Sequence, residues 1–167
     1  EVDLPSVDVG AAEVAGRTFT TLAIPGGEVT GEPGRAGVPV YSRLVAVPAG
    51  ASARVTLTGQ DLVPLPAGKL APVQPETQPG LTTAPAYDAD WYAAASRTQV
   101  SVTAGEPAVA GGVRLVPVTF SPVSWDPASG ELAVARRLTV EVEFSAAAGG
   151  APARPVAESF ARMFEGA

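Results

Sequence analysis

The chain has 167 residues, a single lysine (Lys69), no His, no Cys and a formal net charge of −6. Without imidazole and thiol groups, catalysis by His or Cys is excluded, as are zinc, haem and iron–sulfur sites with those ligands. We therefore expect no metal and no cofactor. The lack of a basic stripe or a long apolar run argues against nucleic-acid binding and against membrane binding.

Proline and glycine punctuate the whole chain. Its 17 Pro and 18 Gly residues divide it into short segments rich in Val, Thr and Leu, which is typical of strands. The predicted strands, after an edge strand within 1–16, are 18–24, 38–47, 53–58, 99–102, 113–120 and 132–144. About seven strands with frequent turn signals favour an all-β fold, an antiparallel β-sandwich.

Two tight connections are predicted between these strands. Pro48-Ala49-Gly50 is a turn that would make 41–58 a hairpin. Asp126-Pro127 and Ser129-Gly130 would turn the chain within 122–131, between the two strongest strands. Residues 28–37 are expected to form a loop.

Residues 61–90 differ in composition from the rest of the chain. They contain prolines at positions 64, 66, 72, 75, 79 and 85. This spacing argues against a central strand or a helix. A long loop inside a compact domain is usually functional or disordered, so we predict that this segment carries the function.

Few side chains suggest catalysis. Asp88 and Asp90 lie beside Trp91 and Tyr92, and two acids near aromatic rings would suit a carbohydrate site. The simpler interpretation is a polar loop with its aromatic rings anchored on the sandwich. The acids match no recognised calcium loop. Lys69 would be the base of a Ser–Lys dyad, but an exposed lysine stays protonated at neutral pH and is a poor base.

The end of the chain is expected to differ from the sandwich. Residues 146–155 have the composition of a linker, and 156–164 are predicted to form a short helix. One apolar stripe at helical spacing is formed by Val156, Phe160, Met163 and Phe164. The predicted organisation is therefore a β-sandwich over 1–145, followed over 146–167 by a linker and helix that lead to another domain.

Several segments between residues 37 and 144 follow one another in an ordered pattern. They are Gly37-Val38-Pro39-Val40, Arg43–Ala51 with its Val-Pro-Ala-Gly turn, Arg54–Leu57, Arg114–Phe120, Asp126–Leu132 and Val140–Phe144. In order and spacing, this pattern resembles the N-terminal propeptide of the gingipain-type (family C25) cysteine peptidases.

The resemblance implies a non-catalytic β-sandwich prodomain that precedes a caspase-like cysteine peptidase domain, its partner. Such a prodomain assists folding and holds the enzyme latent by placing a loop in the active-site cleft, while the catalytic Cys and His belong to the peptidase domain. A secreted or periplasmic bacterial protein is implied. We expect that its targeting segment, absent from the sequence that begins at Glu1, was removed or not included.

The resemblance also implies an inhibitory side chain on a loop in the middle of the prodomain. Lys69 and Arg97 are the basic candidates, and Asp88 and Asp90 apply if the peptidase prefers acidic residues. Two other interpretations stay open: a secreted β-sandwich module that binds carbohydrate or mediates adhesion, and an enzyme that acts through carboxylates alone. A caspase-like domain after residue 167 would favour the prodomain. Glycosidase domains or a cell-wall anchor would favour the binding module.

Overall fold

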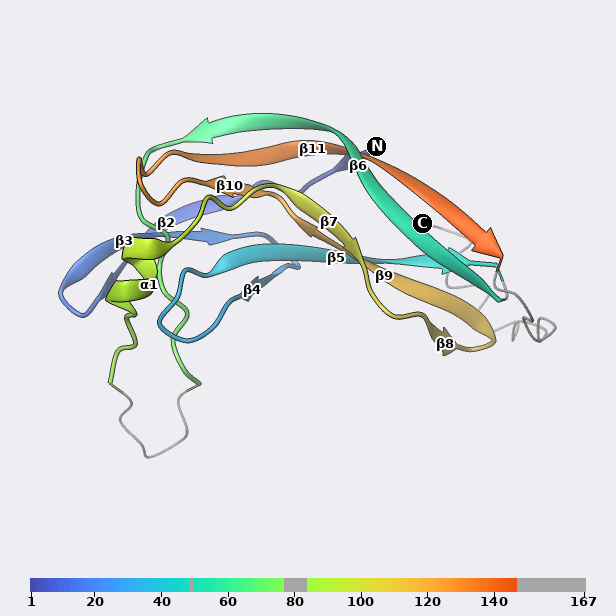
Figure 1. Ribbon diagram of the computed structural model, residues 1–167, viewed down its shortest axis with the longest axis horizontal. Helices are drawn as coiled ribbons and strands as arrows, with labels where there is room; N and C mark the ends of the chain where they lie inside the picture. The colour runs from blue at the N-terminus through green and yellow to red at the C-terminus, as the bar shows by residue number, and fades with distance from the viewer. Residues whose placement is uncertain (49, 77–83, 147–167) are drawn as a thin grey trace.

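The computed structural model describes residues 1–48, 50–76 and 84–146, which form eleven strands and one helix (Figure 1). The elements are β1 (Val2–Asp3), β2 (Asp8–Val14), β3 (Arg17–Ala23), β4 (Glu28–Thr30), β5 (Val38–Val47), β6 (Ala51–Leu65), α1 (Ala89–Ala94), β7 (Ser101–Ala104), β8 (Ala108–Ala110), β9 (Val113–Ser121), β10 (Val123–Trp125) and β11 (Leu132–Ala146). In the described part of the chain, no helix has the length and apolar character needed to span a membrane.

Two antiparallel sheets form the sandwich. In the first, called the β11 sheet, β6 pairs with β11 along its whole length, and β1 and β10 pair with the other edge of β11. In the second, called the β9 sheet, the order is β4-β5-β9-β7, and β8 also pairs with β9. β2 and β3 pair with each other as a hairpin. The predicted all-β sandwich is confirmed.

The core lies between the facing sides of the two sheets. In β11, Leu138 is buried and Val140 and Val142 are half-buried, whereas the intervening Glu141 and Glu143 are exposed. Val118 and Phe120 of β9 are buried on the facing side. This alternation is the expected result of a side-chain period of two with one face in the core and one in water.

Both predicted connections differ from the observed ones. The hairpin over 41–58 is wrong, because β5 pairs with β9 and β6 pairs with β11. The turn at 48–50 therefore carries the chain from one sheet to the other. The second connection is a tighter hairpin than predicted, since β10 occupies Val123–Trp125 and pairs with the start of β11. Pro122 separates β9 from β10, at the point where the chain changes sheets.

Three local predictions also need correction. β6 continues to Leu65 through Pro64, which is tolerated because β6 pairs on one side only and forms a sheet edge. β4 lies in the predicted loop 28–37. The Pro-rich segment 61–90 ends in helix α1, which begins at Ala89. The helix predicted at 156–164, and the linker predicted at 146–155 except for Ala146, lie outside the described residues.

Candidate functional site

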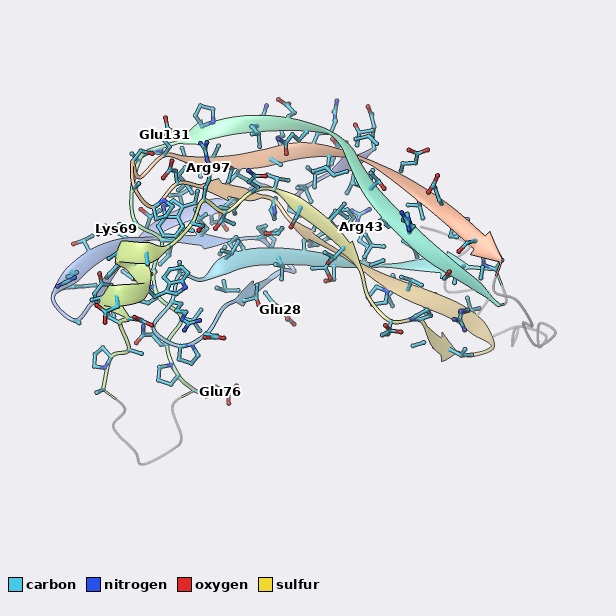
Figure 2. All side chains as sticks on the ribbon, viewed as in Figure 1. Glu28, Arg43, Lys69, Glu76, Arg97 and Glu131 are labelled. Atoms are coloured by element: carbon cyan, nitrogen blue, oxygen red, sulfur yellow. The ribbon has the colours of Figure 1, made fainter. Side chains whose placement is uncertain are left out.

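The sequence-predicted site residues lie at one end of the sandwich, around α1 and the turn 126–131. Gly68 donates its N–H to the Gly130 carbonyl, with N···O 2.9 Å. This bond places Lys69 beside the turn from one side. Arg97 reaches the same turn from the other side, with its Nη2 3.4 Å from Glu131 Oε2. Figure 2 shows Lys69, Arg97 and Glu131 at this end, which we call the aromatic end.

Five aromatic rings pack together here, and their ring centroids are separated by 5.1 to 6.5 Å in the contacting pairs. The rings belong to Phe19, Tyr87, Trp91, Tyr92 and Trp125. Trp125 has no exposed surface, and Phe19 and Tyr92 are also buried. Because buried aromatic rings supply large apolar contact areas in fixed geometry, the cluster is a rigid platform for the loops around it.

The cluster holds the segment 68–71 by its backbone. Trp125 Nε1 donates to the Gly68 carbonyl at 3.0 Å, and the Tyr92 hydroxyl donates to the Leu70 carbonyl at 2.6 Å. Between them, the Lys69 carbonyl accepts from Thr20 N at 2.7 Å. Burial, and secondarily the neighbouring Tyr87, raise the pKa of the Tyr92 phenol above its usual range. The phenol therefore remains a donor to Leu70.

The Lys69 side chain is exposed, although hydrogen bonds hold the backbone on both sides of it. No carboxylate in the described part of the chain forms an ion pair with it. Much of the segment 61–90, which was predicted to be a loop, is therefore held in place by hydrogen bonds to its backbone. Gln74 extends this anchoring, because its side-chain amide exchanges two hydrogen bonds with the backbone of Ala86, at 3.1 and 3.0 Å.

The two acidic candidates lie at the start of α1. Asp88 is the N-cap, and its Oδ1 accepts from Trp91 N at 2.9 Å. Its Oδ2 is 3.6 Å from Arg35 Nε. Asp90 is exposed in the first turn. These contacts account for Asp88 as a helix cap. Within the described ranges, no three Asp or Glu side chains converge in a way that could hold a metal ion.

Arg97 lies in the chain between α1 and β7. The next residue, Thr98, exchanges both backbone hydrogen bonds with Trp125, at 2.8 and 3.1 Å. The Arg97 side chain is 53% exposed and lines an open groove of about 570 Å³. The other lining residues are Leu57, Thr58, Gly59, Gln60, Leu62, Gln99, Val100 and Ser124. Thr58 has no partner in the β6–β11 register, so the groove lies at a β-bulge.

Sequence reasoning missed two residues that fix this end, Trp125 and Glu131. It did predict that Trp91 and Tyr92 are anchored on the sandwich, and both rings pack against Trp125. The available signal was a Trp or Tyr beside turn residues, because a buried indole or phenol normally needs a hydrogen-bond partner. No sequence pattern predicted the groove, because it forms between the bulge in β6 and a segment that is distant from β6 in the chain.

Comparison with known proteins supports the sequence resemblance. The Propeptide_C25 family model matches residues 3–159. Lys-gingipain of Porphyromonas gingivalis is 33% identical over 172 residues, which cover 95% of this chain and 10% of that protein. Lys-gingipain HG66 of the same organism matches with the same identity and coverage. The chain therefore spans about a tenth of the length of the curated relatives it matches.

Two solved structures share this architecture. One, on the zymogenic latency of gingipain K from Porphyromonas gingivalis, has a TM-score of 0.69 and 28% identity, covering 87% of this chain and 85% of that chain. The other, a complex of the pro- and mature domains of RgpB from that organism, has a TM-score of 0.79 over 98% of this chain and 86% of that one. At 17% identity, the second supports the fold alone. The family match and these relatives lead to one conclusion: the chain belongs to the C25 propeptide family, as its ordered motifs predicted.

Proposed function

We propose that this chain is the prodomain of a secreted bacterial gingipain-type cysteine peptidase. It would hold the peptidase domain latent by docking its aromatic end against the active-site cleft. Family membership supports the prodomain, and the related gingipain K structure concerns zymogenic latency. The related RgpB structure contains a pro- and a mature domain in one complex. Residues 1–145 would be the inhibitory and folding-assisting unit, and 146–167 the connection to the peptidase.

The observation that carries this proposal is the rigid presentation of Lys69. The carbonyls of Gly68, Lys69 and Leu70 accept hydrogen bonds from three different elements, while the Lys69 side chain remains exposed. A preorganised backbone loses little conformational entropy when it binds. A single side chain that fills a pocket can carry much of the binding energy. An inhibitor that must occupy a cleft benefits from both properties.

Arg97 is the second basic candidate, and its contacts distinguish it from Lys69. Before Arg97 could enter a pocket, it would have to leave Glu131, whereas Lys69 has no described ion pair to break. We therefore rank Lys69 first and Arg97 second. Asp88 ranks below both because its carboxylate caps α1, and Asp90 remains a candidate for a peptidase that prefers acidic residues.

The test is inhibition of the mature peptidase by the purified 167-residue chain, added in trans. We expect saturable inhibition near stoichiometric concentrations. Lys69→Ala should raise the inhibition constant by about tenfold or more, the effect of losing a binding hot spot. Lys69→Arg should retain part of the inhibition. Arg97→Ala and Asp90→Ala test the remaining candidates.

Arg54→Ala is the matched control, because Arg54 is an exposed basic residue on β6 outside the aromatic end. Unchanged inhibition by both Lys69→Ala and Arg97→Ala would remove the basic anchor. A folded chain that fails to inhibit at all would contradict latency through this domain.

A further inference from the structure

Gly68, the residue before Lys69, occupies a position that leaves no room for a side chain. A Cβ atom placed on Gly68 would lie 2.3 Å from Thr20 Oγ1 and 3.5 Å from Thr20 Cβ. The first distance is far below van der Waals contact, whereas the second is close to it. The Thr20 hydroxyl therefore excludes every residue except glycine from this close approach of two segments.

The close approach lets the backbone around Lys69 pair with β3. Thr20 N donates to the Lys69 carbonyl at 2.7 Å, and Ala71 N donates to the Thr20 carbonyl at 2.8 Å. Thr20 and Leu70 form the corresponding parallel bridge. The backbone that carries the Lys69 side chain is therefore held by β3 as well as by the aromatic rings.

Gly68 also contacts the turn 126–131. Its N–H donates to the Gly130 carbonyl at 2.9 Å, and its own carbonyl accepts from Trp125 Nε1 at 3.0 Å. Gly130 has a φ of 76°, the left-handed conformation that favours glycine. The residue before Lys69 is thus connected to three parts of the aromatic end: β3, the turn and the aromatic cluster.

We propose that Gly68 is the positioning residue of Lys69. An alanine at position 68 would force either Thr20 out of its rotamer or the 68–70 backbone away from β3. Because β-branched side chains such as Thr20 are restricted at χ1, the backbone is the part that moves, and Lys69 moves with it. Lys69 would then have to be ordered during binding, which weakens inhibition. This inference rests on the proposed inhibitory role of Lys69.

Inhibition of the mature peptidase by the full 167-residue chain tests how Gly68 acts. Gly68→Ala should raise the inhibition constant by about tenfold. In a Lys69→Ala background the same change should have no further effect, because a residue that acts only through Lys69 loses its influence when Lys69 is removed. A substitution that merely destabilises the domain would act equally in both backgrounds. Equal effects in the two backgrounds would therefore overturn the proposal.

Thr20→Ala tests the cause of the effect, since it removes Oγ1 and leaves Cβ 3.5 Å from the new Cβ atom at position 68. Thr20→Ala/Gly68→Ala should therefore inhibit as well as Thr20→Ala alone. The matched control is Gly10→Ala, because a Cβ atom on Gly10 would lie 2.8 Å from Oγ1 of Thr21, its partner in β3. Gly10→Ala should leave inhibition unchanged. A comparable loss in this control would assign the effect to a general disturbance of β3 and would contradict positioning by Gly68.

Hydrogen exchange provides a readout that does not need the peptidase. In Gly68→Ala, the amides of Thr20 and Ala71 should exchange about tenfold faster, and the added Thr20→Ala change should restore slow exchange. The amide of Gly105, which donates to Pro117 in the β9 sheet, should not change. Unchanged exchange at Thr20 and Ala71 would mean that Thr20 rotates instead, and would overturn the proposal. If the wild-type chain fails to inhibit, the proposed latency fails, while exchange in Gly68→Ala still supports or overturns the positioning.

Discussion

The two ends of the sandwich are built differently. At the aromatic end, Trp125 and Tyr92 are buried and donate hydrogen bonds to the backbone of the 68–71 segment. At the opposite end, where β8 lies and β11 ends (Figure 1), Phe144 and Val109 are exposed, and the bond from Arg114 to Ala51 bridges the sheets. The contrast teaches that rigidity is concentrated where the candidate inhibitory side chains are presented. The apolar surface is left where the chain continues.

Removing the central ring of the aromatic end should have the largest effect on stability. Trp125→Ala leaves a cavity and the Gly68 carbonyl without its donor, so we expect a loss of about 3–5 kcal/mol of unfolding free energy. Phe144→Ala at the opposite end removes a half-exposed ring and should cost about 1 kcal/mol. Urea denaturation of both variants gives the comparison. Equal losses would show that the two ends do not differ in packing.

Tyr92→Phe should have the next largest effect, because it leaves the buried Leu70 carbonyl without a partner. We expect a loss of about 1–2 kcal/mol at neutral pH. The raised pKa of Tyr92 means that the unfolded chain releases its phenolic proton first, so its contribution to stability falls as pH rises above about 10. Unfolding midpoints measured from pH 8 to 11 should therefore fall less steeply in Tyr92→Phe. Parallel slopes would contradict this assignment.

The cap of α1 should contribute less. Asp88→Ala removes the acceptor for Trp91 N, and we expect a loss of about 1 kcal/mol. Asp88→Asn is the matched control, because asparagine retains the cap but loses the charge facing Arg35. Thermal unfolding of both variants separates the two contributions. If asparagine is as destabilising as alanine, the ion pair matters more than the cap.

The smallest effect is expected at the turn 126–131. Backbone N–H groups of Ala128 and Ser129 hold the pKa of Asp126 below its usual value of 3.8. A lowered pKa means that this carboxylate stabilises the fold above about pH 4, and that the contribution is lost as pH falls further. Asp126→Asn should accordingly lose less stability between neutral pH and pH 2. Urea midpoints against pH would reveal this, and a wild-type-like acid profile in the variant would refute it.

The sequence patterns predicted local elements better than their pairing. The strand 38–47 is observed with the predicted bounds, and β11 follows the predicted alternation, because burial of one face leaves a period of two. The false hairpin at 41–58 arose because a turn signal does not specify whether the next strand stays in the same sheet. Helix α1 was missed because its six residues are too few for a periodic pattern, and only its Asp88 cap marked it.

The candidate site was predicted in composition but not in geometry. The family resemblance, together with their location in the middle of the chain, singled out Lys69 and Arg97 before the structure. That both lie beside one turn depends on contacts of Gly68 with Gly130 and of Arg97 with Glu131, which join segments far apart in sequence. Neither contact has a local sequence signature.

The long pairing of β6 with β11 has a consequence for synthesis of the chain. The paired residues of the two strands are about 65 to 95 positions apart in the sequence. Such a large sequence separation makes strand pairing slow. At about 5–20 residues per second, ribosomes would complete β11 on the order of 4–16 s after β6. During that interval β6 has no strand to pair with, and its exposed edge could pair with other nascent chains. The domain can close its sandwich only after nearly all of its described sequence has been made.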